Sequence, residues 1–296
     1  MAHMTHMRLL NCIFQCNPPR SVSVQPGEEC HWYTGDVRRL TEIASGVLVA
    51  TSSFDQTTST VVLGSDGGCL LIDPAVTVAE LARLASDLRE LGVRPSAAWS
   101  THPHWDHVLW SLDLGRAPRY ATPTAAAVAR AERAELARET QRSVPGHDFL
   151  LLGRLTPLAA DTIPWDGPAA QVIAHNGHAP GHGAVFLPGT GVLVAGDMCS
   201  DVETPLLDLT AADPLGDYRA GLERLASVAG VRHVVPGHGH AGDAGEFQRR
   251  LTADAAYLDA LVLGLPFGDP RLAAGSPQWL RDAHAEQLRY VQGAGS

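Results

Sequence analysis

Several short apolar segments of this chain end in loops that carry histidine or aspartate. Residues 97–101 read as a short strand, and the run Thr-His-Pro-His-Trp-Asp-His begins at the last of them. The strands that we predict at 171–175, 191–195 and 232–235 are also followed by such loops. Strand ends can converge at one edge of a sheet, and α/β proteins place their sites at that edge. The pattern therefore favours a fold that gathers the four loops.

The periodicity of the remaining chain predicts a layered α/β protein. Strands are expected at 46–51, 59–64 and 68–73, where apolar and β-branched residues lie between turn-forming segments. Leucines at helical spacing predict a helix over 78–91. Further helices are expected over 123–142, 218–228, 246–263 and 278–291. A strand meander followed by alternating helices and strands fits an α/β protein with two sheets.

We divide the chain into an arm over residues 1–39 and one domain over 40–296, with C-terminal helices. The arm has weak periodicity, and its first seven residues resemble an expression tag or a misplaced start. No low-complexity linker divides the domain. Four residues of the arm could form a further zinc site, although their spacing fits no tight rule: Cys12, Cys16, Cys30 and His31.

Charge and cysteine usage restrict the partners and the compartment. The net charge of -10 disfavours a nucleic-acid backbone as the main partner. The five cysteines are odd in number and scattered, as expected for a reducing cytoplasm. No apolar run is long enough for a membrane span, and no signal peptide is expected from residues 8–16. We expect a small-molecule substrate and no membrane partner, and the oligomeric state stays open.

The loop after residue 101 indicates a metal site. Three histidines and an aspartate within six residues would be costly to bury without a metal or other partners. Imidazole and carboxylate donors suit zinc, iron or manganese better than a soft thiolate site does. In an irregular loop, His102 and His104 can face one point, while Asp106 and His107 turn to a neighbouring one. One loop can thus supply two ligands to each of two metals.

A carboxylate elsewhere in the chain can join two such metals. Asp197 follows a glycine at the end of a predicted strand and is the natural bridge. A bridging carboxylate would hold two ions roughly 3.5–4 Å apart and confine a hydroxide between them. Five isolated histidines are interpreted as ordinary core or surface residues: His31, His147, His175, His233 and His240.

Four motifs, in this order, resemble those of the metallo-β-lactamase superfamily. They are His-x-His-x-Asp-His at 102–107, Pro-Gly-His at 180–182, Gly-Asp at 196–197 and Pro-Gly-His at 236–238. The resemblance implies a four-layer αββα sandwich with two zinc ions at one edge of the sheets, iron or manganese being alternatives. It also implies Asp73 as a supporting acid and Asp197 as the bridge. The implied zinc ligands are His102, His104 and His182 for the first ion, and Asp106, His107 and His238 for the second.

The resemblance further implies a hydrolase in which a metal-bridging hydroxide attacks the substrate. Asp106 is the expected catalytic residue, because a ligand carboxylate can also pass protons. The presence of Asp197 favours the glyoxalase II, lactonase and thioesterase branch, with a carboxylic ester, lactone or thioester as substrate. The alternatives are a phosphodiesterase or nuclease of the same fold and, less favoured, a β-lactamase.

Two neighbours of Asp197 bear on the branch. Cys199 is interpreted as a small packing residue and not as a ligand. Ser200 stands where some lactonases have a tyrosine, and the short C-terminal tail has no lysine, so neither a lactone nor glutathione is assigned. Five apolar side chains are expected either to line the pocket or to pack in the core: Phe54, Trp105, Phe149, Met198 and Leu206.

Overall fold

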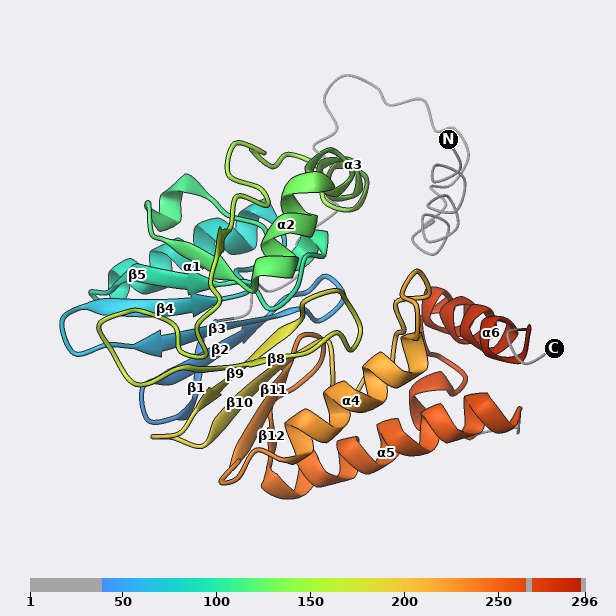
Figure 1. Ribbon diagram of the computed structural model, residues 1–296. Coiled ribbons are helices and arrows are strands. Elements are labelled where there is room, and N and C mark those ends of the chain that lie inside the picture. Colours follow the sequence, from blue (N-terminus) through green and yellow to red (C-terminus); the bar gives the residue numbers. More distant parts are fainter. Residues whose placement is uncertain (1–38, 265–267, 294–296) are drawn as a thin grey trace.

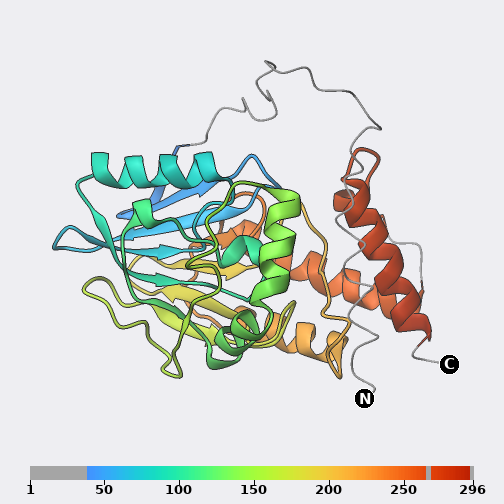
Figure 2. The same ribbon diagram turned by 90° about the horizontal axis from the view of Figure 1, so that it is seen from above.

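The computed structural model describes residues 39–264 and 268–293. Two β-sheets lie face to face, and helices cover the outer face of each (Figure 1). A view turned by 90° shows the same succession of layers (Figure 2). The predicted four-layer αββα sandwich is thus confirmed.

The first sheet has seven strands that lie side by side in chain order. Strands β1 to β4 form an antiparallel meander, and β4 to β7 run parallel. Their bounds are β1 Thr41–Ala44, β2 Val47–Thr51, β3 Thr58–Leu63, β4 Gly68–Ile72, β5 Arg94–Trp99, β6 Arg119–Ala121 and β7 Thr156–Pro157.

The second sheet has five strands in the order β12-β11-β10-β9-β8. Only β10 and β11 are parallel, and the other neighbours are antiparallel. Their bounds are β8 Gln171–Ala174, β9 Gly183–Leu187, β10 Val192–Gly196, β11 His233–Pro236 and β12 Gly242–Asp243.

Helices α1, α2 and α3 lie on the side of the first sheet, whereas α4 and α5 cover the second (Figures 1 and 2). Helix α6 packs on α5. The helix bounds are α1 Val78–Glu90, α2 Pro123–Ala131, α3 Arg133–Ser143, α4 Pro214–Ala226, α5 Ala244–Leu263 and α6 Gln278–Gly293. Three short 3-10 turns are η2 Trp105–His107, η3 Leu112–Leu114 and η4 Pro270–Leu272.

Alternation along the strands explains the layering. Leu70 of β4 belongs to the apolar cluster between the sheets, while Leu71 packs outward against α1. In β10, Val194 faces the same inter-sheet cluster and Leu193 packs toward α4 and α5. Successive side chains of a strand point to opposite faces, so each sheet is apolar on both sides and needs a cover on both.

Most predicted elements are present, with bounds that shift by a few residues. The helix expected over 123–142 is two helices, because the backbone of Glu132 (φ -97°, ψ 9°) ends α2 and begins α3. The sequence analysis missed β1, β6, β7, β9 and β12. Strand β9 begins with Gly183 and Ala184, two residue types with a low strand propensity.

Two further expectations concern the N-terminal arm and membrane-spanning helices. The arm predicted for residues 1–39, with its cysteines, lies outside the described residues except for its last position. In the described part of the chain, no helix is long and apolar enough to cross a membrane.

Candidate metal centre

Residues from four loops meet where β5, β8, β10 and β11 end. Two groups of histidine and aspartate side chains lie there, and within each group the potential ligand atoms are within 4.8 Å of one another. The first group comprises His102, His104, His178 and Asp197. The second comprises Asp106, His107 and His238.

Asp73 holds the histidine-bearing loop at the end of β5. It follows β4 directly, in a left-handed conformation (φ 46°), and its side chain is buried. Its carboxylate accepts hydrogen bonds from the Thr101 backbone N–H (2.9 Å) and hydroxyl (2.6 Å), and lies 3.0 Å from His107 Nδ1. Asp73 therefore lies behind the metal-binding loop, as the resemblance implied for a supporting acid.

The same contacts orient two imidazoles. The Thr101 hydroxyl donates to Asp73, so it can accept from His102 Nδ1–H at 3.0 Å. The Nδ1–H of His107 can likewise donate to Asp73. In the neutral form of either ring, Nε2 is then the nitrogen without a proton and the one available as a metal ligand.

In the first group, three imidazole nitrogens and a carboxylate oxygen face one another. His104 Nδ1 lies 3.1 Å from His102 Nε2 and 3.0 Å from His178 Nε2. Asp197 Oδ2 lies 3.3 Å from His102 Nε2 and 3.2 Å from His178 Nε2. His178 Nδ1–H can donate to the carbonyl oxygen of Leu206 (3.0 Å), which directs Nε2 into the group.

The structure corrects one predicted ligand, because His178 takes the place that was assigned to His182. The His182 ring is fully buried and stacks between the rings of His102 (centroids 5.1 Å apart) and His175 (4.4 Å). Its carbonyl accepts from the His175 backbone N–H at the start of the β8–β9 pairing. Its Nε2 faces Gly196, where an added Cβ would be only 2.3 Å away. The sheet thus keeps this ring behind the site.

In the second group, Asp106 and two imidazoles converge from different sheets. Asp106 Oδ2 lies 3.4 Å from His107 Nε2 and 3.3 Å from His238 Nε2. The two imidazole Nε2 atoms are 3.4 Å apart. His238 follows β11 of the second sheet, so this group forms only where both sheets meet.

The loop after β2 orients His238. Nδ1 of His238 lies 2.8 Å from the carbonyl oxygen of Asp55, to which its N–H can donate. Asp55 and Gln56 both have left-handed backbones (φ 47° and 54°). The Gly239 N–H donates to the Gln56 carbonyl, and the Thr58 N–H donates to the Gly237 carbonyl (2.7 Å). These bonds fasten a loop of the first sheet to the end of β11.

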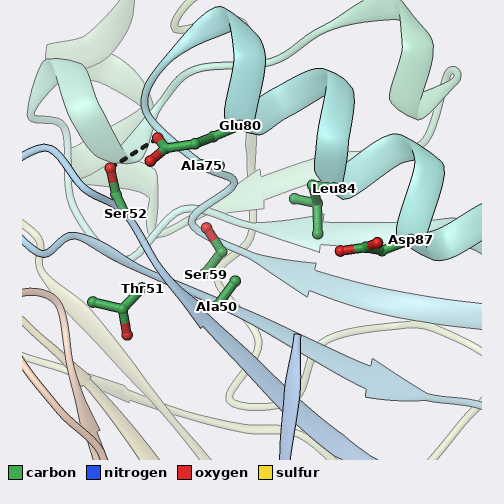
Figure 3. Close-up of a pocket in the computed structure, with 8 residues that line it drawn as sticks. All are labelled: Ala50, Thr51, Ser52, Ser59, Ala75, Glu80, Leu84 and Asp87. Atoms are coloured by element: carbon green, nitrogen blue, oxygen red, sulfur yellow. Dashed lines mark hydrogen bonds between the residues drawn. The ribbon is translucent and has the colours of Figure 1, made fainter. Parts of the chain in front are cut away.

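Residues that line a small pocket beside α1 hold the beginning of that loop (Figure 3). Buried Glu80 accepts from the Ser52 hydroxyl (2.8 Å) and the Ser53 N–H (2.8 Å), and it also completes the capping box of α1 with Thr77. Burial raises the pKa of Glu80, but the hydrogen bonds outweigh it and lower the pKa. None of the candidate metal ligands lines this pocket, so we assign it to structural support.

Asp197 contacts both groups. Besides its contacts in the first group, its Oδ1 lies 3.2 Å from His107 Nε2, and its Oδ2 lies 3.3 Å from His238 Nε2. Glycine at 237 permits this placement, since an added Cβ there would be 1.8 Å from Asp197 Oδ1. The predicted bridge thus lies between the two groups.

The charges are arranged as a cation site would require. Burial would raise the pKa of Asp197, but His107 and His238 hold it well below its usual value. Burial, followed by the proximity of His178, lowers the pKa of His104 to about 3. In the first group, imidazole nitrogens face one another at 3.0 and 3.1 Å, so their lone pairs can converge on a cation. Such a donor set fits divalent cations such as zinc, iron or manganese.

One ligand oxygen also has no other partner. Asp197 Oδ1 is buried without a hydrogen-bond partner among the described residues. A buried carboxylate oxygen is normally paired or bound to a metal. The residues present therefore fit a two-metal centre.

The imidazoles of the second group have raised pKa values, in contrast to the lowered pKa of His104 in the first group. Burial would lower the pKa of His107, but Asp197 and Asp106 raise it well above its usual value. Burial would likewise lower the pKa of His238, but Glu203 and Asp197 raise it. Sequence reasoning missed Glu203, whose Oε1 lies 3.6 Å from His238 Nδ1, because no motif marks it.

Several other sequence interpretations concern the walls of the site. Trp105 and Met198 are packed in apolar clusters, and Phe54 contacts the Trp105 ring edge-on (centroids 5.7 Å apart). Cys199 is buried in the cluster beneath α4 and α5, as expected for a packing residue. The Ser200 hydroxyl donates to the His238 carbonyl (2.8 Å), so it is engaged within the protein.

Comparison with known sequences agrees with this geometry. Hydroxyacylglutathione hydrolase from Synechococcus sp. (strain JA-3-3Ab) is 34% identical over 128 residues. The match covers 43% of this chain and 42% of that protein, so the chain spans less than half the length of this curated relative.

Solved structures share the fold. A metallo-beta-lactamase family protein from Thermus thermophilus is 24% identical, with a TM-score of 0.61, over 86% of this chain and 95% of that one. TTHA1623, solved in a di-iron-bound form, is 28% identical, with a TM-score of 0.53, over 68% of this chain and 97% of that one. The profile of the metallo-beta-lactamase superfamily matches residues 53–258. The match covers most of the chain and the whole candidate metal centre, and the chain therefore belongs to the metallo-beta-lactamase superfamily.

Proposed function

We propose that this chain is a metal-dependent hydrolase that cleaves a carboxylic ester, lactone or thioester. The observation that carries the proposal is the position of Asp197 between two groups of inward-facing donors. We propose zinc at both positions, with iron and manganese as alternatives, since these ions share a preference for imidazole and carboxylate ligands.

The proposed chemistry divides between the metals and the protein. When bound, two divalent cations would lower the pKa of a water between them and polarise the substrate carbonyl. Asp106 is the proposed proton acceptor: its Oδ2 lies beside His107 and His238, which leaves its second oxygen for a proton. The Thr57 hydroxyl, 3.4 Å from Asp106 Oδ2, restrains this carboxylate.

Two observations favour an acyl substrate. The name of the Synechococcus relative, hydroxyacylglutathione hydrolase, describes hydrolysis of an acyl compound, in that case a thioester. The net charge of -10 disfavours the polyanionic substrates of a nuclease. We therefore propose a small-molecule acyl substrate and a cytoplasmic enzyme.

A substrate panel with metal analysis on the same preparation tests the proposal. The metal-loaded protein is assayed with a lactone, an S-acyl thioester, a p-nitrophenyl ester and bis-p-nitrophenyl phosphate. We expect two metals per chain and turnover of at least one acyl substrate that a chelator abolishes. Asp197→Ala is the matched control and should lose both metal and turnover. Turnover of the phosphodiester alone, or a strictly mononuclear metal-replete protein, would contradict the proposal.

A further inference from the structure

The segment that follows Asp197 is clasped to His238. The Ser200 hydroxyl donates to the carbonyl oxygen of His238 (2.8 Å) and accepts from the backbone N–H groups of Val202 (3.1 Å) and Glu203 (3.0 Å). The Glu203 carboxylate lies 3.6 Å from His238 Nδ1. The side chains of Ser200 and Glu203, held on this segment, therefore contact a ligand residue of the second group.

This segment is itself held from the C-terminal part of the chain. Cys199 has a left-handed backbone (φ 56°), and its N–H donates to Asp254 Oδ2 (3.2 Å). Its carbonyl accepts from Arg250 Nη1 (3.2 Å). The carbonyl oxygens of Ser200 and Glu203 both accept from a single atom, Arg271 Nη1, at 3.2 and 3.0 Å.

The guanidinium group of Arg271 is buried and held in one orientation by two aspartates. Its side chain is 5% exposed and also donates to Asp254 Oδ1 (2.6 Å) and to both oxygens of Asp269 (3.0 and 2.8 Å). Burial would lower the pKa of the guanidinium, but Asp269 and Asp254 raise it, so it stays charged. A planar fork can satisfy acceptors in several fixed directions at once, which the single ammonium of lysine cannot do.

Neither Arg271 nor Asp269 belongs to the segment that the superfamily profile matches, which ends at residue 258. Both lie at or beside the short turn η4, between α5 and α6. The support of residues 199–203 thus comes partly from a region outside the matched domain.

We propose that Arg271 is a positioning residue for the second metal group. By fixing the carbonyl groups of residues 200 and 203, it keeps His238 Nε2 directed at Asp106 and His107. The inference rests on the proposed metal centre, whose ligands Arg271 does not touch. Partners that orient a metal ligand from behind are typically worth about 10–100-fold in metal affinity.

The test compares Arg271→Met and Arg271→Lys with the wild type and with Arg219→Met. Arg219 is a matched control because it likewise forms an ion pair with an aspartate of α5, Asp259, but this pair is largely exposed and lies away from residues 199–203 in the contacts that it makes. The two stepwise dissociation constants for Zn²⁺ are measured by competition with a chromophoric chelator. Hydrogen exchange over residues 198–204 is measured on metal-free protein.

We expect Arg271→Met to weaken one of the two Zn²⁺ steps by about 10–100-fold and to leave the other nearly unchanged. Exchange over 198–204 should accelerate, Arg271→Lys should recover part of the loss, and Arg219→Met should behave as the wild type. Equal weakening of both steps together with a lower Tm would show a general loss of stability and overturn the inference, as would two unchanged constants.

Ser200→Ala keeps the test decisive if Arg271→Met does not fold. It removes the hydroxyl contact with the His238 carbonyl and leaves the buried ion pairs intact, so the same Zn²⁺ step should weaken by a smaller factor. An unchanged ratio of the two constants in folded Ser200→Ala would overturn the inference. If the wild type binds no Zn²⁺, the proposed function fails, whereas the exchange measurement still decides whether Arg271 holds the segment.

Discussion

The two groups of the candidate metal centre draw on the same loop but are supported differently. The first group, His102, His104, His178 and Asp197, includes His104, which reaches the surface and whose Nδ1 contacts only other candidate ligands. The second group, Asp106, His107 and His238, has a fixed acceptor behind each imidazole: the Asp73 carboxylate and the Asp55 carbonyl. The first group is thus the more open of the two, and the second the more firmly oriented.

This difference assigns distinct roles to the groups. The firmly oriented second group includes Asp106, the proposed proton acceptor, and we infer that a substrate would approach from the side of the exposed His104. Their protonation also differs, because burial lowers the pKa of His102 and His104, whereas carboxylates raise the pKa of His107 and His238. The following variants and conditions act on one group and not the other.

The largest effect is expected at Asp106. Asp106→Asn keeps the size and one oxygen ligand but removes the proton acceptor, so turnover of an acyl substrate should fall by about 10²–10⁴-fold. Metal content should fall much less. Both quantities are measured on the same sample, and a loss of turnover that merely parallels the loss of metal would reduce Asp106 to a ligand.

Substitutions at His178 and His182 separate the structural assignment from the sequence prediction. His178→Ala removes an inward-facing donor of the first group and should weaken the binding of one metal by about 100-fold or more, above the usual effect of residues that only orient ligands. His182→Leu should retain both metals, because neither ring nitrogen has a hydrogen-bond partner in the described structure. Elemental analysis after dialysis distinguishes them, and the reverse result would restore His182 as the ligand.

A pH titration of metal affinity should also separate the groups. The raised pKa values mean that His107 and His238 hold protons in the metal-free protein above pH 6.5, and a metal must displace them. Affinity at the second group should therefore rise with pH, by about tenfold per pH unit for each displaced proton, until both pKa values are passed. In the first group, His102 and His104 should release no proton to a metal above pH 5, since the pKa of His102 lies well below its usual value and that of His104 is about 3. Identical pH profiles for the two metals would contradict this distinction.

Cys199→Ser should have the smallest effect on the metals. Burial raises the pKa of the thiol well above its usual value, so no thiolate is available, and the side chain packs beneath α4 and α5. We expect unchanged metal content with a modest loss of stability, measured by chemical unfolding beside His104→Ala. A loss of metal as large as that of His104→Ala would make Cys199 a ligand after all.

The sequence predicts the layers of the fold well, because they depend on local patterns. The short apolar runs of β4 and β10 and the leucine spacing in α1 are visible in a single sequence. The strand β9 begins with glycine and alanine, which have a low strand propensity, and the break at Glu132 has no glycine or proline to mark it.

The candidate site was predictable only where its residues are close together in the chain. The loop over 102–107 is recognisable from its three histidines and one aspartate. His178 and His182, however, flank the same Ala-Pro-Gly turn, and their spacing alone does not show which of them is the ligand. The pairing of β8 with β9 makes the choice. The roles of the Asp55 carbonyl and of Arg271 could not be predicted from the sequence. A backbone acceptor has no sequence signature, and the role of an arginine depends on the residues that surround it in the fold.

The bond between His238 and the Asp55 carbonyl joins residues 183 positions apart. Bringing together points so distant along the chain carries an entropic cost that must be met before the contact forms. Long-range contacts of this kind generally slow folding, so the second metal group should be complete only after the sheets have docked. A cation bound there then acts as a cross-link between the two halves of the sandwich. It makes the resistance of the folded chain to unfolding depend on metal concentration.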